Sequence, residues 1–239
     1  MLLRNADIAL YAAKGEGKGR HVVFKDFLHE RALHRMHVES GLRRALERDE
    51  LRLHYQPIVT STLHQLVGVE ALLRWQDPEH PGLILPDGFV SVAEATGMIV
   101  PLGRWVLSEA CRQVRQWQAT IPGQERIRLT VNVSARQLQE ASIISDVEAA
   151  LATSGLAAEL LVLEVTESTI ATNPKAATAR LSSLRGIGVK IAIDDFGTGQ
   201  SSLAQLQLLP VDAIKIDQSF VRRLSQDPTA AAVIQSVVD

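Results

Sequence analysis

The chain has 239 residues, of which 46% are hydrophobic and 22% are charged, a balance typical of one large globular domain with or without a short extra segment. The formal net charge is −2 and no stretch concentrates basic residues, so we expect no nucleic-acid polymer as a partner. Cys111 is the only cysteine, which excludes a disulfide framework and fits a reducing, cytoplasmic setting. No apolar run approaches the roughly 20 residues that cross a bilayer. Any membrane attachment would therefore be through segments upstream of this sequence.

The first 25 residues predict one helix and one short strand. Apolar residues recur at helical spacing from Leu3 to Ala13, the glycines that follow end the pattern, and 21–24 is a short apolar strand. One helix and one strand cannot bury their own apolar faces. We therefore expect residues 1–25 to be the end of a domain whose body lies upstream.

A connecting helix and two strands are expected next. Residues 25–50 mix charges of both signs with apolar residues at i, i+4, which predicts a helix with Gly41 as a candidate break. Residues 51–59 and 66–75 each predict a strand. Because only six residues separate the two strands, too few for a crossover helix, we expect them to pair antiparallel.

Helices and strands alternate along the remaining chain. We predict a long helix over 101–120 and strands over 129–133, 161–165, 189–193 and 213–216. Further helices are expected between these strands, including a short one over 202–208, and a last helix from about Pro228.

Two of the intervening helices carry boundary signals. Ser145 with Glu148 predicts a capping box at the start of one helix, which should end near Gly155. For the next helix, Asn173 is the expected N-cap, Pro174 lies in the first turn, and Gly186 is expected just past the end.

One hairpin followed by repeated strand–helix units predicts an α/β fold, a (β/α) barrel of mostly parallel strands, with an open doubly wound sheet as the rival. The barrel is favoured because polar residues lie near the C-terminal ends of many strands, and in a barrel these ends converge on one mouth. The residues are Asn132, Glu164, Asp194, Asp195, Lys215 and Asp217, and Glu70 lies within the second strand.

This set of side chains suggests cation chemistry. Asp194 and Asp195 end an apolar strand, where two adjacent carboxylates repel unless a cation neutralises them; the alternative is that one caps a helix and the other is solvated. With the other strand ends they suit two oxygen-liganded Mg²⁺ or Mn²⁺ ions, which can support phosphoester hydrolysis. Lys215 could polarise a water or hold developing negative charge. Arg74 could grip a phosphate or pair with a surface acid.

The ordered motifs resemble those of EAL domains, the bacterial phosphodiesterases specific for cyclic di-GMP. They are EALLRW at 70–75, NVS at 132–134, EVTE at 164–167, DDFGTG at 194–199 and KID at 215–217. The resemblance runs from about Ser40 to the C-terminus. It implies a modified TIM barrel with an antiparallel first strand, and hydrolysis of cyclic di-GMP to linear pGpG with Mg²⁺ or Mn²⁺.

The resemblance also implies residue roles. Lys215 would contact the catalytic water, and Glu167 would brace the loop that holds Phe196, Gly197, Thr198 and Gly199. That loop also mediates dimer contact in the family, so a homodimer is implied as well. The metal ligands would be Glu70, Asn132, Glu164 and Asp194 for one cation and Asp195 for the second. The residues that contact the ligand would be Gln56, Arg74 and Asp217.

The opening segment resembles the end of a GGDEF domain, without that domain's signature loop. We therefore divide the chain into a GGDEF remnant (1–25), a linker helix (26–39) and an EAL domain (40–239). Two departures stand out: Gln200 replaces a usual aromatic residue, and the chain ends at Asp239, before two further strands expected of the family. We expect a fragment with six of eight strands and low or no activity alone. The alternative is a degenerate EAL domain that binds cyclic di-GMP without cutting it.

Overall fold

The computed structural model describes residues 26–79, 82–197 and 209–223, with side chains from residue 35 onward. Six strands form one sheet in the order β1-β2-β3-β4-β5-β6, so each strand lies beside the next one along the chain. An open doubly wound sheet would reverse its order at a switch point. The sequential order therefore supports the barrel-type arrangement over its rival within the described residues.

The first two strands form the expected antiparallel pair. β1 (Leu51–Val59) and β2 (Leu66–Trp75) have the predicted bounds, and Leu51 lies opposite Trp75. The other strands run parallel to β2 in succession. They are β3 (Arg128–Asn132), β4 (Leu161–Thr166), β5 (Lys190–Phe196) and β6 (Ala213–Ile216).

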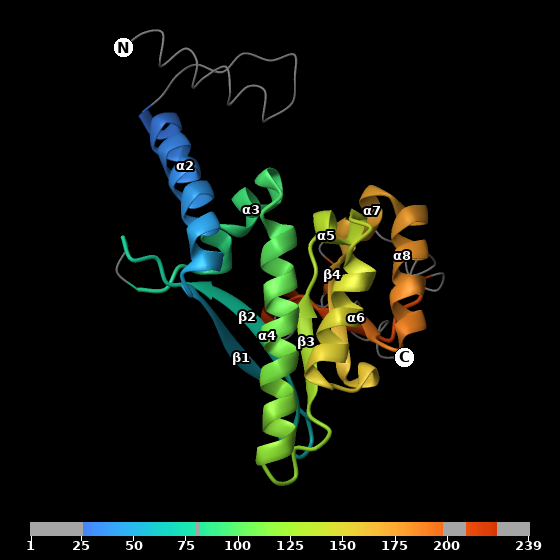
Figure 1. Ribbon diagram of the computed structural model, residues 1–239. Helices are drawn as coiled ribbons and strands as arrows, with labels where there is room; N and C mark the ends of the chain where they lie inside the picture. The colour runs from blue at the N-terminus through green and yellow to red at the C-terminus, as the bar shows by residue number, and fades with distance from the viewer. Residues whose placement is uncertain (1–25, 80–81, 198–208, 224–239) are drawn as a thin grey trace.

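Helices cover the outer face of the sheet. α4 (Ile99–Thr120), α6 (Ile143–Ser154) and α8 (Pro174–Ile187) stand side by side in Figure 1. Their apolar faces and the strands share the main core, in which Leu129, Leu161 and Ile191 are fully buried. Burial on this scale is the dominant stabilising contribution, at about 25 cal/mol per Å² of apolar surface.

A second core lies where α2 (Asp26–Glu47) meets the barrel. Its centre is Trp75, which has no exposed surface and contacts Phe89 edge-on at 6.1 Å between ring centroids. Leu42 of α2 is also fully buried there, and α3 (Val90–Thr96) completes the cluster. The first half of α2 extends away from the body of the molecule (Figure 1).

Several boundary predictions are wrong. α2 is continuous through Gly41; a Cβ at this position would come within 2.5 Å of the Trp75 indole, so the glycine allows close packing and does not break the helix. Ser145 does not form a capping box, because α6 begins at Ile143 and the Ser145 hydroxyl donates to the Ser142 carbonyl instead. Gly186 lies inside α8, and Gly188, with a φ of 105°, ends the helix.

Other boundaries are confirmed. Gly155 ends α6 in a left-handed conformation, and the Asn173 side chain caps α8 ahead of Pro174. The long helix begins at Ile99, slightly before the expected start. Sequence reasoning missed the short helices α3, α5 (Ala135–Gln139), α7 (Glu167–Thr172) and α10 (Gln218–Arg223).

The predictions for 1–25, the helix over 202–208 and the helix from Pro228 lie outside the described residues. Within the described ranges, no helix combines the length and the apolar character that a bilayer crossing requires.

Candidate functional site

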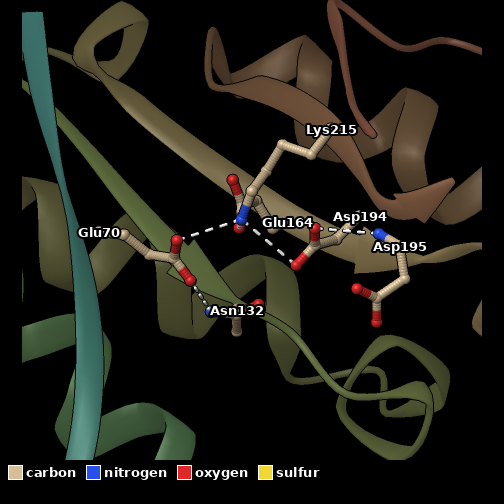
Figure 2. A network of polar contacts seen from close by, with 6 residues as sticks. All are labelled: Glu70, Asn132, Glu164, Asp194, Asp195 and Lys215. Atoms are coloured by element: carbon tan, nitrogen blue, oxygen red, sulfur yellow. Dashed lines mark hydrogen bonds and ion pairs between the residues drawn. The ribbon is translucent and has the colours of Figure 1, made fainter. Parts of the chain in front are cut away.

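Side chains from five neighbouring strands meet at the mouth of the sheet. Lys215 on β6 lies at the centre, and its Nζ is 2.5 Å from Glu164 Oε2, 3.1 Å from Glu70 Oε2 and 3.3 Å from Asp194 Oδ2. The other Glu70 oxygen accepts a hydrogen bond of 2.8 Å from the Asn132 amide. Figure 2 shows these side chains pointing toward one another. The expected convergence is therefore present.

Strand register explains why these residues meet. In parallel strands the C-terminal ends lie at one edge of the sheet, and Asn132 on β3 is the direct partner of Glu164 on β4. Thr166, two residues further along β4, is the partner of Asp194 on β5. The polar side chains thus occupy neighbouring positions along one rim.

A bulge at the end of β5 separates its two aspartates. From Ile193 to Phe196 the strand advances three residues, while β6 advances two from Ile214 to Ile216. Asp195 takes a left-handed conformation with a φ of 55°, and its N–H donates to the Asp194 carboxylate at 2.9 Å. In Figure 2 the Asp195 carboxylate lies beyond Asp194, away from Lys215. The two carboxylates therefore occupy two adjacent places at the rim.

The electrostatics of this cluster are dominated by burial. Glu164 has only 3% of its surface exposed, and burial raises its pKa to about 7 even though the hydrogen bond and charge of Lys215 lower it. Burial alone would lower the pKa of Lys215, but the hydrogen bond to Glu164 and the charges of the carboxylates raise it above its ordinary value. Burial, followed by the charges of Asp194 and Asp217, raises the pKa of Asp195. Lys215 is therefore an ammonium at neutral pH.

The donor chemistry fits a hard divalent cation. Glu70, Glu164 and Asp194 bring three formal negative charges around the single ammonium of Lys215, and carboxylate and amide oxygens are the ligands that Mg²⁺ and Mn²⁺ prefer. Among the described residues, no group of three acidic, histidine or cysteine side chains has a geometry that could hold a metal ion. A cation held by these carboxylates would share the space in which the Lys215 ammonium now lies.

The expected ligand-contacting residues lie around the same rim. Arg74 is four residues after Glu70 on β2, and therefore on the same face of the strand; its guanidinium donates to the Leu73 carbonyl at 2.8 Å. Gln56 on β1 is exposed and lies opposite Glu70 in the antiparallel pair. Asp217 accepts the Ser219 N–H at 2.8 Å, and hydrogen bonding to the Ser219 side chain, followed by this backbone hydrogen bond, lowers its pKa. In this structure Asp217 therefore caps the start of α10.

Glu167 contacts the residue at which the loop after Asp195 begins. It is the first residue of α7, only 5% exposed, and its Oε2 accepts the Gly197 N–H at 3.4 Å. Thr166 fixes the start of α7 by accepting the Thr169 N–H. Phe196 is buried and Gly197 has a φ of 98°. Thr198 and Gly199 lie outside the described residues.

Sequence reasoning missed two features beside the site. Ser134 and Gln137 form a full capping box that starts α5 directly after β3, a pattern that the Ser-x-x-Gln spacing could have revealed. Gln137 fits against Gly103 of α4, where a Cβ would come within 1.8 Å of its amide. The other feature is the ring of Phe220, which lies on Gly197; no local sequence signal indicates that contact.

Comparisons with known proteins agree with this geometry. A model of the EAL domain family matches residues 39–239. The bifunctional diguanylate cyclase/cyclic di-GMP phosphodiesterase MucR of Pseudomonas aeruginosa is 44% identical over 237 residues, which are 99% of this chain and 34% of that protein. The cyclic di-GMP phosphodiesterase PdeR of Escherichia coli is 39% identical over 237 residues, 99% of this chain and 35% of that protein. The chain thus spans about a third of the length of these curated relatives.

Solved structures show the same likeness. The PaMucR phosphodiesterase in complex with c-di-GMP matches with a TM-score of 0.78 and 46% identity, over 84% of this chain and 80% of that chain. The EAL enzyme Bd1971, bound to cAMP and cyclic di-GMP, matches with a TM-score of 0.80 and 30% identity, over 99% of this chain and 61% of that chain.

Proposed function

The chain belongs to the EAL domain family, and from that premise we propose that its site hydrolyses cyclic di-GMP to linear pGpG with two divalent cations, Mg²⁺ or Mn²⁺. The observation that carries the proposal is the convergence of three carboxylates and Lys215 from separate strands. The phosphodiesterases named among the relatives support it further.

The carboxylates and the amide would hold the cations. Glu70, Asn132, Glu164 and Asp194 would hold the first, and Asp195 the second. Bound there, such ions activate water and stabilise negative charge on phosphoester oxygens. The split of Asp194 and Asp195 by the β5 bulge supports two neighbouring cation positions over one.

Lys215 and the rim residues would act on water and substrate. The Lys215 ammonium would position the attacking water and stabilise charge on the phosphoryl oxygens. Arg74 would leave the Leu73 carbonyl and donate to a phosphate oxygen, with Gln56 and Asp217 contacting the rest of the ligand. Glu167 would hold the Gly197 backbone. Hydrolysis adds water across one P–O bond, which leaves a phosphate monoester and a free hydroxyl.

The other assignments of the sequence analysis are part of the same proposal. They comprise the GGDEF remnant and linker helix, the homodimer contact through the loop after Asp195, and the cytoplasmic setting. Nucleic-acid polymers are not proposed as partners, since the net charge is −2.

Product analysis tests the proposed reaction. The full protein that carries this sequence, incubated with cyclic di-GMP and Mn²⁺, should yield pGpG by chromatography. Lys215→Met and Glu164→Gln should each reduce turnover by about 10²-fold or more, because each removes a group aimed at the reacting centre. Asp146→Asn, which removes an ion pair with Arg104 on an outer helix, is the matched control and should retain activity.

The same experiment also tests the alternative, a degenerate EAL domain that binds cyclic di-GMP without hydrolysing it. Absence of turnover by the wild-type protein, with calorimetry still showing cyclic di-GMP binding, would contradict the enzyme and support the degenerate sensor. Absence of both turnover and binding would contradict both functions.

A further inference from the structure

Three strand ends are connected through one residue, Gly197. Its N–H donates to Glu167, which follows β4, and Gly197 itself follows β5. Gly197 also packs against Phe220 of α10, which follows β6. We infer that Phe220 is a positioning residue that fixes the bulge carrying Asp195, and with it the second cation position. This inference rests on the proposed role of Asp195.

The contact between Gly197 and Phe220 leaves no room for a side chain. A Cβ built on Gly197 would come within 2.8 Å of Phe220 Cε2, 3.0 Å of Cζ and 3.5 Å of Cδ2, so one edge of the ring packs directly on the glycine. The φ of 98° at Gly197 also belongs to the region that favours glycine. The Gly197 backbone therefore contacts both the Glu167 carboxylate and the Phe220 ring.

Phe220 is itself well fixed. Its N–H donates to the Asp217 carbonyl at 3.1 Å, and the Asp217 carboxylate accepts the Ser219 N–H. The Arg223 guanidinium lies 5.4 Å from the centre of the ring. Asp217 is two residues after Lys215. The turn that positions Phe220 therefore directly follows β6, the strand that positions the Lys215 ammonium.

The bulge needs such support. Asp195 has a φ of 55°, and a residue other than glycine in this conformation persists where its surroundings hold it. On the N-terminal side it is held by the ladder of β5 and by the hydrogen bond to Asp194. On the C-terminal side Phe196 is buried and pairs with Ile216 of β6, and Gly197, one residue further, is held by Glu167 and Phe220. Loss of the ring would remove one of these supports, and we infer that the bulge would then hold Asp195 less firmly in its position.

Mn²⁺ binding to the full protein tests the inference without reference to catalysis. Counted by electron paramagnetic resonance, the wild type should bind two ions, and Phe220→Ala should weaken the second by about tenfold while the first keeps its affinity. The kcat for cyclic di-GMP should fall more than the KM changes. Phe220→Leu, which keeps apolar bulk, should recover most of the second-site affinity.

A double-mutant cycle tests whether the two residues act as a pair. Gly197→Ala should weaken the second Mn²⁺ more than Phe220→Ala does, since the new Cβ would meet the ring. In the Phe220→Ala background the additional effect of Gly197→Ala should be several-fold smaller. Fully additive effects would overturn the inference.

Two controls separate the possible failures. Asp195→Asn should remove the second ion, and Phe220→Ala added to it should have no further effect on Mn²⁺ binding. A wild type that binds no Mn²⁺ would contradict the proposed function, whereas two ions bound equally by wild type and Phe220→Ala would contradict only the role of Phe220. If Phe220→Ala does not give a cooperative melting curve, Gly197→Ala is judged by the same titration: an unchanged second Mn²⁺ site in that variant would contradict the inference.

Discussion

Asp195 combines an unfavourable backbone conformation with an unfavourable charge. Its φ is 55°, which costs most residues about 1 kcal/mol or more but which asparagine and aspartate tolerate. Its pKa is raised by burial and by the charges of Asp194 and Asp217, so ionisation is disfavoured in the folded state. Both features are typical of a residue kept for function at some loss of stability.

Two substitutions separate these contributions. In buffer with EDTA, Asp195→Asn should be at least as stable as the wild type, because it removes repulsion and keeps a residue suited to the conformation. Asp195→Ala should be less stable than Asp195→Asn by about 1 kcal/mol. Urea denaturation measures both. Equal stability of the two variants would show that the backbone conformation at 195 carries no such cost.

Glu164 predicts a pH dependence of stability. Its pKa is raised from 4.5 to about 7 in the folded state, mainly by burial, so the folded protein holds this proton more tightly than the unfolded chain does. The contribution of Glu164 to stability is therefore fully present below pH 4.5 and is lost as the pH rises through about 7. The difference is on the order of 3 kcal/mol.

Unfolding at pH 5 and pH 8 in EDTA measures this effect. The wild type should lose stability between these values, and Glu164→Gln, which cannot titrate, should lose less. Parallel pH profiles for the two proteins would contradict the assignment to Glu164.

At the scale of elements, α2 is fixed to the barrel by a close approach at Gly41. A Cβ there would lie 2.5 Å from two atoms of the Trp75 ring, and Trp75 ends β2, the strand of Glu70 and Arg74. The indole also donates to Glu50 Oε2 at 3.4 Å. Movement of α2 would therefore act directly on a strand that carries site residues.

Two glycine-to-alanine changes give opposite predictions. Gly41→Ala should destabilise the protein by about 1–3 kcal/mol, because the helix or the indole must shift. Gly186→Ala, in α8 with nothing within 4 Å of the new Cβ, should stabilise it by about 0.5–1 kcal/mol, the usual helix preference for alanine. Thermal melting of both variants measures these stability changes. Stabilisation by Gly41→Ala would contradict the close packing of Gly41 on Trp75.

The helix boundaries show where local sequence signals fail. Asn173 with Pro174 predicted the start of α8 correctly, because both act through the adjacent backbone. Gly186 and Gly188 are equally plausible helix ends by sequence, and only the folded chain shows that Gly188 takes the left-handed conformation that ends α8. Likewise, Gly41 predicts a helix break by sequence alone, whereas in the folded chain it packs closely against Trp75, which is distant in sequence.

Across the whole molecule, the candidate site residues could be predicted where they lie at the ends of strands, because those ends can be predicted from the sequence. Polar residues that close apolar runs identified Asn132, Glu164 and Asp194, and parallel topology brought them together. The bulge that separates Asp194 from Asp195 was not predictable, because it depends on the register between β5 and β6. The contact of Phe220 with Gly197 arises from the same tertiary pairing.

The proposed cations should stabilise the entire fold, because they link strands from β2 to β5. A ligand that binds only the folded state adds about 2.7 kcal/mol at one hundred times its Kd, which for a chain of this size raises the Tm by roughly 5–10 °C. We expect that shift on adding Mn²⁺ to the EDTA-treated wild type, measured by calorimetry.

Matched variants locate the origin of the shift. Asp194→Asn should lose most of it, since the carboxylate 3.3 Å from Lys215 Nζ is removed. Asp146→Asn should retain it, since Asp146 pairs with Arg104 on the outer helices at 2.8 Å and offers nothing to the mouth of the sheet. A shift of equal size in both variants would mean that Mn²⁺ stabilises the protein from another place, and the cluster around Lys215 would then hold no cation.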